Sequence, residues 1–508
     1  MTPTLAGRWR QAVAARPDAT FLIFEGPGET VASWSYASFD MQVSRVAAGL
    51  VRCGVDRGSA VHMALTNGPA FVAIWLAAAR LGAWIVPSDP ASTPPELAGH
   101  ISRTKPAVGI CSTARRAAYL DARPGMPVVA IDDHDTSLEA LAGPSAGGAA
   151  HSEPAPRDRA AVMFTSGTTS IPKGVVITQA NYAFAGDVMA AAAQLGPGDR
   201  QFVVLPLFHA NAQYYSFASA ISAGASVALM HSFSASRFLG QAARHEVTHA
   251  SLFAAPMRMI LARGANPVSG LRLRHCWYAQ NVTDAQYEQL ADLLGCAPRQ
   301  LYGMTETIPA VLANRALHPV PSAIGEPTLG CQVDLRRPDD GGQVSDGEVG
   351  EIVVGGEPGR TLFAGYFDDP VTTASAFCDG WFLTGDLARR DHDGRYTFVG
   401  RRSDILKVAG ENVSVVEVES VLAQHPSVLE AAVIGEPDPV RDEVPVGYVV
   451  QQPGAAPVTP EELIAWCNDR LAKSKRPRRI EVVTELPRTS VGKIRKFALR
   501  ASTSTAAS

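Results

Sequence analysis

Hydroxyl side chains, glycines and one lysine are concentrated in residues 165–174, which read TSGTTSIPKG. Backbone N–H groups of a glycine-containing loop and Ser or Thr hydroxyls can bind phosphate oxygens, and Lys173 adds a positive charge. The Walker A pattern is not met, because Gly174 follows the lysine and neither Ser nor Thr comes next. An ordinary Ser/Thr-rich turn is the alternative, but five hydroxyl residues in six positions beside a lysine favour a phosphate-binding loop.

A second candidate segment is Tyr302–Thr307, with the sequence YGMTET. A tyrosine ring could cover a nucleotide base, and Glu306 could hold a divalent metal that bridges phosphates, since magnesium takes only one or two protein carboxylates. A capped turn with a solvated Glu306 is the alternative. His209 ends a strand-like segment, Leu205–His209, where a histidine is either structural or catalytic.

A third candidate is a carboxylate and a guanidinium at the base of a predicted hairpin. Asp393-Gly394 is a strong signal for a two-residue hairpin turn. Counting outward from it pairs Asp391 with Tyr396 and, further out, Asp386 with Arg401 on one face. A carboxylate beside a guanidinium can accept two hydrogen bonds from a vicinal diol such as ribose. A plain cross-strand ion pair is the alternative, and a bulge would break the register.

The elements that must position these residues are predicted from hydrophobic periodicity. Strands are expected on both sides of the phosphate loop, at 160–164 and 175–178. Residues 1–150 alternate helical patterns with short apolar strands, which predicts βαβ units, a mostly parallel sheet and an α/β fold class. Examples are the helix at 43–52, the strands at 60–64 and 108–111, and a buried helix running into a strand at 70–87.

The pattern changes after Arg401. Ser414–Glu417 reads as a capping box that opens a helix, and Thr459–Glu462 caps a second helix with proline in its first turn. The basic run 473–479 is interpreted as the solvated end of that second helix. We therefore expect a large domain, residues 1–401, with βαβ-rich sheets, and a small mobile α+β domain, residues 402–508.

Composition limits the classes of function. The net charge of −4 argues against nucleic-acid binding and membrane-surface binding. The N-terminal residues lack the apolar core of a signal peptide, and the stretch 70–87 is too short and interrupted to insert into a membrane. Seven scattered cysteines without a Cys-x-x-Cys pair predict a reduced, cytoplasmic protein and give no metal signal.

Taken together, these segments resemble the adenylate-forming superfamily, which contains acyl-CoA synthetases, luciferases and the adenylation domains of peptide synthetases. The resemblance covers about residues 20 to 500 and rests on the motifs TSGTTSIPKG, YGMTET, WFLTGD, GRRSDILK and PRTSVGK. Ile308-Pro309 and three further segments look most like bacterial carnitine/crotonobetaine-type CoA ligases. The segments are 358–361, 425–426 and 441–443. The resemblance implies that an acid attacks the α-phosphate of ATP, that pyrophosphate leaves, and that a thiol, most simply that of CoA, takes the acyl group.

The resemblance also implies roles for particular residues. The β- and γ-phosphates would be held by Thr165, Ser166, Gly167, Thr168, Thr169 and Lys173. Nucleotide contacts would come from Ala279, Gln280, Tyr302, Gly303, Met304 and Thr305, with Asp386 and Arg401 on the ribose. Glu306 would bind Mg2+, Lys493 would bridge the acid and the α-phosphate, and His209 would gate the acid pocket. Tyr214, Trp277, Tyr278 and Ile308 would line that pocket, and Ser403-Asp404 would be the hinge.

Three departures from the family pattern qualify this assignment. Ser170 and Ser403 stand where relatives usually have Gly and Asp or Lys, respectively. Residues 277–281, WYAQN, replace a glycine-rich turn, which indicates a small or polar acid. Tyr214, Tyr215, Trp277 and Tyr278 could form an aromatic box for a cation or an aryl ring; packing in the core is the alternative.

Several functions remain open on the sequence alone. The leading one is an ATP-dependent acid–CoA ligase. Within the same fold, the chain could be a diazotase that activates nitrite for reaction with an aromatic amine, or a free-standing adenylation enzyme that loads a carrier protein. A non-catalytic nucleotide-binding protein is disfavoured, because Glu306, Asp386, Arg401 and Lys493 are all present.

Overall fold

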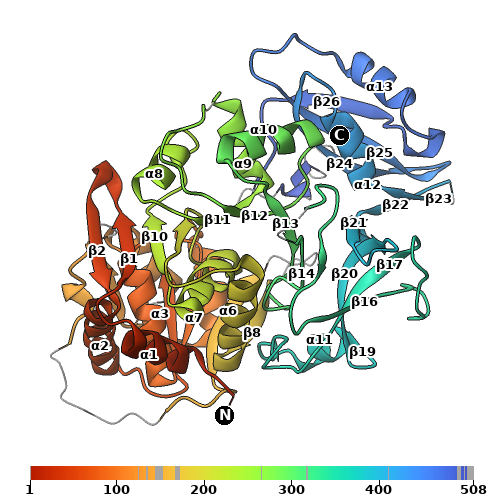
Figure 1. Cartoon of the computed structure of the whole chain (residues 1–508). Coiled ribbons are helices and arrows are strands. Elements are labelled where there is room, and N and C mark those ends of the chain that lie inside the picture. The colour runs from red at the N-terminus through yellow and green to blue at the C-terminus, as the bar shows by residue number, and fades with distance from the viewer. Residues whose placement is uncertain are drawn as a thin grey trace.

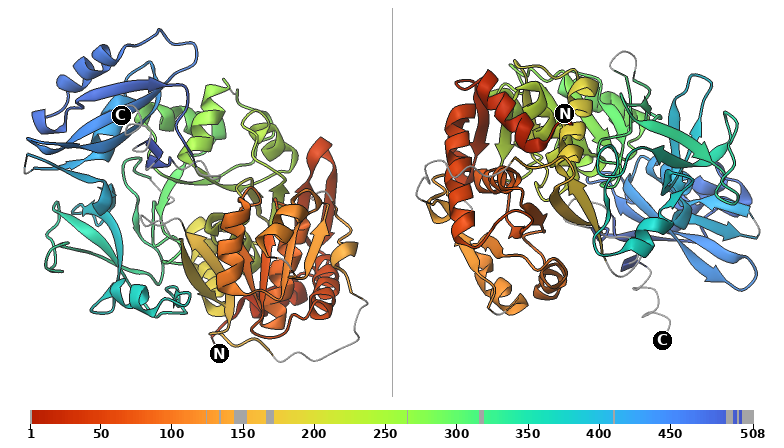
Figure 2. Two further views of the ribbon diagram at one scale, coloured as in Figure 1. Left: turned by 180° about the vertical axis from the view of Figure 1, so that it is seen from behind. Right: turned by 90° about the horizontal axis from the view of Figure 1, so that it is seen from below.

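The computed structural model describes residues 2–123, 125–132, 135–143, 153–165, 172–264, 266–315, 319–409, 411–488, 494–496 and 498–499. These residues form a large N-terminal body and a smaller C-terminal body, joined after a long hairpin (Figure 1). Seen from behind and from below, the small body stands beside the end of the large one (Figure 2). Within the described residues, no helix has the length and apolar character needed to cross a membrane.

Two mixed sheets with helices around them form the core of the large body. The described residues of the first sheet make nine strands. In spatial order these are β15 (Glu326–Pro327), β14 (Leu312–Ala313), β13 (Arg299–Tyr302), β12 (His275–Ala279), β11 (His249–Phe253), β9 (Arg200–Val203), β10 (Ser226–Met230), β1 (Thr20–Glu25) and β2 (Val31–Ser35). The strands from β13 to β1 pair in parallel, so their carboxyl ends lie at one edge.

The second sheet contains the strands predicted for the N-terminal part. Its described strands, in spatial order, are β18 (Gly365–Tyr366), β8 (Lys173–Thr178), β7 (Arg159–Thr165), β4 (Trp84–Pro87), β3 (Ala60–Ala64), β5 (Val108–Ser112) and β6 (Val128–Ile131). The strands from β7 to β6 run parallel, as the βαβ pattern predicts. The α/β fold class is therefore confirmed.

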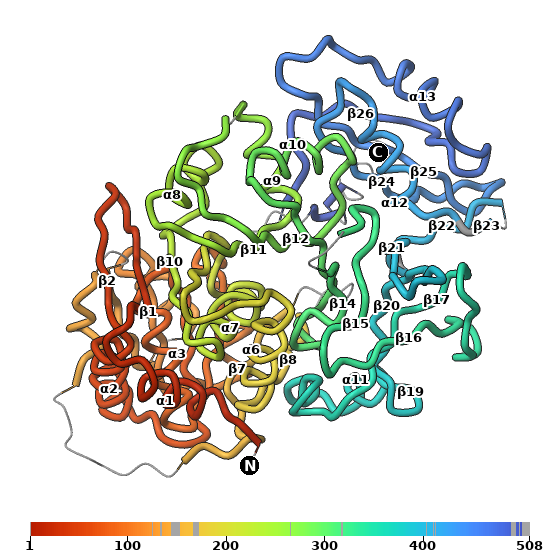
Figure 3. The backbone as a smooth tube through the Cα atoms, viewed as in Figure 1, coloured from red at the N-terminus to blue at the C-terminus, as the bar shows by residue number. Residues whose placement is uncertain are grey.

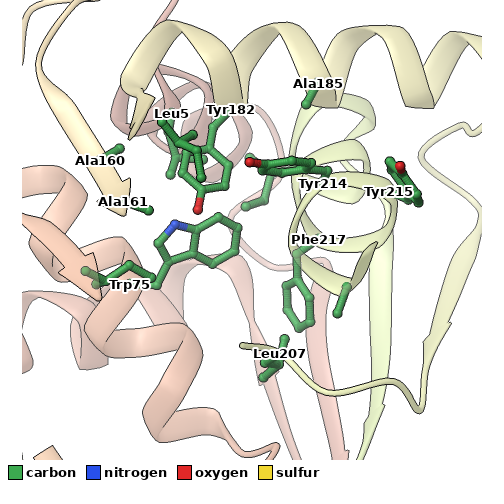
Figure 4. Packing of buried hydrophobic residues seen from close by; sticks show 14 of the residues in the cluster. Leu5, Trp75, Ala160, Ala161, Tyr182, Ala185, Leu207, Tyr214, Tyr215 and Phe217 are labelled. Atoms are coloured by element: carbon green, nitrogen blue, oxygen red, sulfur yellow. The ribbon is translucent and has the colours of Figure 1, made fainter. Parts of the chain in front are cut away.

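The helices of the large body are α1 (Leu5–Ala15), α2 (Tyr36–Arg52), α3 (Pro69–Leu81), α4 (Pro94–Thr104), α5 (Arg116–Ala122), α6 (Gln179–Ala193), α7 (Ser219–Ala223), α8 (Phe238–Arg244), α9 (Ala254–Ala262), α10 (Asp284–Leu294) and α11 (Pro370–Ser375). Helix α3 is buried on nearly every side, which explains its continuous apolar sequence. Its Trp75 packs 5.1 Å from the ring of Tyr182 in α6 (Figure 4). Residues 211–218, the element η4, form a π-helix that continues into α7.

A third sheet leads from the large body to the small one. Its strands are β16 (Gln332–Arg336), β17 (Val349–Gly355), β20 (Trp381–Arg390), β19 (Phe377–Cys378) and β21 (Tyr396–Arg401). The tube in Figure 3 passes from β20 through β21 directly into the small body. Residues 402–404, the short helical turn η5, follow β21 at that junction.

The small body is an α+β unit, as predicted. Its strands are β23 (Glu411–Ser414), β22 (Ile405–Val408), β25 (Asp442–Gln451), β24 (Val428–Asp438) and β26 (Arg479–Val483), and its helices are α12 (Val415–Ala423) and α13 (Pro460–Asn468).

Two details of the prediction for the small body are wrong. The hydroxyl of Ser414 donates to the carbonyl of Val399 in place of capping α12, and Glu417 pairs with Lys475, so this capping box does not form. The basic run is not the end of α13, because the helix stops at Asn468 and the run begins with a separate short turn. The capping box of Thr459 at α13 is confirmed.

Candidate active site

The hairpin of β20 and β21 brings Asp386 and Arg401 together, as the sequence predicts. The two residues are register partners, and the Arg401 Nε lies 3.2 Å from a carboxylate oxygen of Asp386. The predicted pairing nearer the turn is wrong by one residue, since Tyr396 pairs with Arg390 in place of Asp391. The connection spans residues 391–395, with Gly394 at φ +79°, and a bulge beside Leu387 restores the register.

Tyr302 and Arg401 both contact the Asp386 carboxylate. Asp386 is 3% exposed, and the hydroxyl of Tyr302 donates to its second oxygen at 2.7 Å. Burial, followed by the charge of Asp386, raises the pKa of Tyr302 well above its usual range, so the hydroxyl keeps its proton. Tyr302 and Arg401 engage different oxygens of Asp386, which fixes the orientation of the carboxylate.

Glu306 forms a second charged group nearby. The carboxylate is 5% exposed, and the hydroxyl of Tyr366 donates to it at 3.2 Å. Burial raises the pKa of Glu306, and the Tyr366 hydroxyl and the Lys173 charge offset part of this rise. The Lys173 ammonium lies over the Tyr366 ring at 4.9 Å, which brings the end of the phosphate loop to Glu306.

Glu306 also fits a magnesium ion. Magnesium binds one or two protein carboxylates and completes its shell with phosphate oxygens and water. A cation beside Glu306 would stabilise the ionised form that burial disfavours. Among the residues that the structure describes, no cluster of three or more His, Cys, Asp or Glu side chains could enclose a metal, so the substrate phosphates would supply the other ligands.

The phosphate loop connects two antiparallel strands. Thr165 ends β7, Lys173 begins β8, and the two residues are register partners. The proposed phosphate ligands Ser166, Gly167, Thr168 and Thr169 lie outside the described residues, as do Ser170 and Lys493. The boundaries of the loop therefore agree with the sequence prediction, and the contacts of its interior stay a prediction.

The segments after β12 and β13 have unusual backbone conformations. Gln280 has φ +75° and Ile308 has φ +73°, in the left-handed region that side chains rarely adopt, above all β-branched ones. Gly303 allows a close approach: a Cβ there would lie 2.8 Å from the Tyr215 hydroxyl and 2.9 Å from the carbonyl oxygen of Pro309. The Thr307 hydroxyl accepts from the Met304 N–H at 2.8 Å and fixes this turn, which also contains Thr305. Such strain is typical of ligand-binding segments.

The acid side of the site lies between η4 and the first sheet. Tyr215 projects from η4 to Gly303, which follows β13. On the sheet, Trp277 is 1% exposed, and Ala279 ends the same strand on the same face, because alternate residues of a strand share a face. His209 precedes η4 with its ring 4.4 Å from that of Phe208.

The structure does not bring the four predicted aromatic residues together. Tyr278 lies on the face of β12 opposite Trp277, in the cluster with Cys276, and its hydroxyl donates to the carbonyl of Pro321 at 3.3 Å. Tyr214 points into the core, with its ring 5.5 Å from that of Tyr182, whereas Tyr215 lies on another side of η4 (Figure 4). Tyr214 therefore points away from Tyr215, and Tyr278 points away from Trp277.

Residues 402–404, where the hinge is predicted, are tied to both bodies. Arg402 donates to Glu351 of the large body at 3.0 Å, and another Glu351 oxygen accepts from the Gly385 N–H at 2.9 Å. In the small body, Lys496 lies 3.8 Å from Asp404 and 2.7 Å from Glu419. The side chain of Ser403 lies outside the description.

Two residues on either side of Lys493 in the sequence lie side by side. Arg488 and Ile494 form an antiparallel bridge, and Arg488 pairs with Glu430. In the large body, burial lowers the pKa of Arg258, and the charges of Glu430 and Arg488 act on the same guanidinium with opposite signs. Arg488 therefore lies near α9, which contains Arg258. Arg258 also donates to the carbonyl of Asn281 at 2.6 Å, beside Gln280.

Sequence reasoning missed several residues that complete the site. Tyr366 and Glu351 stand in ordinary strand patterns, and only the three-dimensional pairing reveals that they orient Glu306 and the hairpin. Asn211 and Ser251 are buried polar residues in apolar surroundings, a signal that the sequence does contain. Lys496 follows Lys493 by three residues, but its contact with Asp404 depends on the fold.

Comparisons with known proteins agree with this geometry. Residues 9–367 match the AMP-binding enzyme family, and residues 417–493 match the AMP-binding enzyme C-terminal domain. Crotonobetaine/carnitine–CoA ligases from Salmonella arizonae and Citrobacter koseri are each 32% identical over 97% of this chain and 98% of theirs.

Solved structures give the same result. The chain resembles ATP-bound MatB from Rhodopseudomonas palustris with a TM-score of 0.88, at 26% identity over 98% of both chains. The apo form of that protein matches with a TM-score of 0.78, at 26% identity over 99% of both chains. A benzoate CoA ligase from Burkholderia xenovorans matches with a TM-score of 0.87, at 27% identity over 98% of this chain and 99% of that one. The chain belongs to the AMP-binding enzyme family.

Proposed function

We propose that this protein is an AMP-forming acid–CoA ligase that activates a small carboxylic acid. The acid would attack the α-phosphate of ATP, pyrophosphate would leave, and the CoA thiol would then take the acyl group from the adenylate. The observation that carries this proposal is the buried Asp386 carboxylate, held by Tyr302 and Arg401, in the same site as Glu306 and Lys173. This combination suits a nucleotide sugar on one side and its phosphates on the other.

On the nucleotide side, Asp386 would accept the two ribose hydroxyls, while Tyr302 and Arg401 fix its orientation. Lys173 and the hydroxyls of the phosphate loop, from Thr165 onward, would bind the β- and γ-phosphates. Bound magnesium would neutralise phosphate charge, with Glu306 as its protein ligand. Because the acid and ATP repel each other as anions, positive charge at the point of attack is the main contribution that the protein can make.

We infer that Lys493 supplies that charge and can be withdrawn. It would lie on the small domain, for which we propose the bounds 402–508, with residues 1–401 as the large domain and Ser403-Asp404 as the hinge. The greater likeness to the ATP-bound than to the apo form of MatB supports an adenylation-like orientation of the small domain. Rotation about the hinge would remove Lys493 and open the cavity to the thiol.

The acid itself would be short. Trp277 and Tyr215 fill the space in which a long acyl chain would lie, and the relatives include ligases for carnitine and for benzoate. His209, Ile308 and the Ala279–Gln280 segment would border the reacting carboxylate. The seven cysteines are scattered along the sequence without a Cys-x-x-Cys pair, which supports a location in the reducing cytoplasm.

A screen of carboxylic acids tests the proposal. Purified protein, ATP and magnesium are incubated with each acid, with and without CoA, and release of AMP and pyrophosphate is measured. We expect AMP release that depends on an acid and turns over only with CoA. AMP release that needs nitrite and an aryl amine would identify a diazotase, and turnover only with a carrier protein would identify a free-standing adenylation enzyme. ATP binding without any turnover would indicate a non-catalytic protein.

A further inference from the structure

Several side chains around η4 and the first sheet have buried polar atoms without hydrogen-bond partners, and three of these residues are small or neutral hydrogen-bonding groups. In these three, the atoms are both amide atoms of Asn211, the hydroxyl of Ser251 and the indole N–H of Trp277, and each lacks a partner within the described part of the chain. The residues are 6%, 4% and 1% exposed, respectively. A buried polar atom without a partner is rare in native proteins, so each of these needs an explanation.

Ser251 and Trp277 lie on the face of the first sheet that η4 covers, and Asn211 is part of η4. Ser251 and Trp277 are register partners on neighbouring parallel strands, so their side chains lie side by side on one face. η4 covers that face: the Gln201 amide donates to the carbonyl of Tyr215 at 3.4 Å and to the Ser219 hydroxyl at 3.2 Å. Gln201 is itself the register partner of His249, which shares the face of Ser251.

Asn211 stands at the site end of the same helix. It is the first residue of η4 and precedes Tyr215, whose hydroxyl reaches Gly303, by four residues. Residues four apart lie on neighbouring parts of a helical surface, so Asn211 and Tyr215 lie close together on η4, the element that covers the face of Ser251 and Trp277. A π-helix at this place is itself typical of functional sites.

The charge around these residues selects against a cationic ligand. Arg299 is the register partner of Trp277 on β13, and its guanidinium carbon lies 5.6 Å from the centroid of the Trp277 ring. The side chain is 6% exposed, and it makes no ion pair within the described residues. A positive charge beside the indole opposes a second cation bound at the same residues, and the aromatic residues that could offset this repulsion, Tyr214 and Tyr278, point elsewhere.

We propose that the acid activated by this protein is a compact one whose far end carries an uncharged hydrogen-bonding group, such as a hydroxyl or amide, bound by Asn211, Ser251 and Trp277. The inference rests on the proposed acid–CoA ligase activity and specifies its substrate class. The Trp277 N–H donates, whereas the Asn211 amide and the Ser251 hydroxyl can each donate or accept. The three groups can therefore satisfy a small polar substituent that a hydrocarbon acid would leave unpaired.

The size of the expected preference follows from the cost of unpaired groups. A substrate that leaves a buried donor or acceptor unsatisfied loses about fivefold to a hundredfold in affinity per group. Sites that hydrogen-bond a substrate hydroxyl discriminate strongly against the analogue that lacks it. We therefore expect at least about a tenfold preference in kcat/KM for an acid with the polar substituent over the same skeleton without it.

The test uses matched acids. For each short aliphatic or aryl skeleton, kcat/KM is measured for the parent acid, its hydroxyl derivative and a trimethylammonium derivative, with the full-length protein, ATP, magnesium and CoA. We expect the hydroxyl derivative to be preferred at one position of the skeleton and the trimethylammonium derivative to be the poorest. Equal use of parent and hydroxyl acids, or preference for the cation, would overturn the inference and leave the ligase activity intact.

Two variants assign the preference to this site. Asn211→Leu and, as the smaller change, Ser251→Ala should each reduce the hydroxyl preference about fivefold or more without changing the KM for ATP. Ser226→Ala is the matched control, because Ser226 is a buried serine in the same sheet whose hydroxyl accepts from Arg200 at 3.0 Å. It should leave the preference unchanged. An unchanged preference in both site variants would refute the assignment, and absence of turnover with every acid would instead refute the ligase activity.

Discussion

The nucleotide side and the acid side of the site differ in how their polar groups are satisfied. On the nucleotide side, Asp386 is bonded by Tyr302 and Arg401, and Glu306 by Tyr366. On the acid side, Asn211 and its neighbours Ser251 and Trp277 have buried polar atoms without partners in the described structure. Both sides are buried, so the difference does not follow from exposure.

This contrast indicates how the two ligands are recognised. A ligand that every member of a family uses can be held by groups that the protein itself orients, since preorganised groups lose little entropy on binding. The acid differs between members of the family, and each member can select its acid with polar groups that only the correct acid satisfies. Changes on the nucleotide side should therefore affect all acids alike, and changes on the acid side should affect them selectively.

The largest expected effect is that of Lys493→Ala. Removing a cation that stabilises the transition state should slow adenylate formation about a thousandfold for every acid, as measured by acid-dependent ATP–pyrophosphate exchange. Transfer from a synthetic acyl adenylate to CoA should stay within about tenfold of wild type, because that step would take place with the lysine withdrawn. Lys473→Ala, at an exposed lysine of the same domain, is the control. Equal losses in both steps would contradict the withdrawal of Lys493.

Asp386→Asn should weaken ATP binding without changing the order of preference among acids. The substitution removes the charge that pairs with Arg401 and accepts the ribose hydroxyls. Hydrogen bonds to charged groups contribute about 1.5–3 kcal/mol each, so we expect the Kd for ATP to rise about 30-fold by calorimetry. Asp346→Asn removes a surface carboxylate that pairs with Arg390 and serves as the control. An unchanged Kd would refute the ribose assignment.

The scaffold beneath the nucleotide side should lose stability in acid. His62 is fully buried between the Tyr119 hydroxyl at 2.7 Å and the Ser88 hydroxyl at 3.1 Å. Burial, followed by the charge of His100, lowers the pKa of His62 from 6.5 to about 3. The unfolded chain therefore binds the proton more tightly, and stability falls as the pH drops from about 6.5 towards about 3.

At pH 5, the titration of His62 alone should lower the free energy of unfolding by about 2 kcal/mol relative to pH 7. Urea denaturation at the two pH values measures the difference, and His62→Gln should reduce it. His100, with its pKa lowered to about 4 chiefly by burial, stacks on Phe164 at 4.1 Å and acts in the same direction. A His62→Gln protein with the same pH dependence as wild type would contradict this account.

The smallest expected effect is that of Gln280→Gly, at the border between the two sides. Glycine relieves the left-handed conformation at φ +75° but makes the unfolded chain more flexible, so the free energy of unfolding should rise by less than about 1 kcal/mol in urea denaturation. Gln194→Gly, at φ +55° in an exposed turn, is the matched control and should change stability alone. Gln280→Gly should also change the KM for ATP or for the acid severalfold. A lower free energy of unfolding in this variant would contradict the prediction, because it would show that the Gln280 side chain stabilises the left-handed conformation.

The sequence predicts the nucleotide side better than the acid side, for a physical reason. Asp386 and Arg401 are linked by a hairpin, a local structure in which counting residues defines the partners. Even there the count is right only because a bulge beside Leu387 compensates for a longer turn. The fold class and the strands around the phosphate loop follow from periodicity, which is also a local property.

The acid side depends on contacts between distant segments. The sequence places Tyr214 next to Tyr215 and Trp277 next to Tyr278, and neither pair has both members at the site, because neighbouring residues of a helix or strand point in different directions. Tyr366 meets Glu306 from sixty residues away. Such pairings require the tertiary structure, as does the contact of Lys496 with Asp404, the predicted hinge residue.

The central claim is that a carboxylate oxygen of the acid becomes bonded to the α-phosphorus of ATP. A direct measurement uses an accepted acid labelled with 18O in its carboxylate, with ATP, magnesium and CoA, and mass spectrometry of the nucleotide product. We predict AMP that carries one 18O atom, because the acyl–oxygen bond breaks when the thiol takes the acyl group. Unlabelled AMP, or ADP with the label in phosphate, would contradict adenylation of the acid.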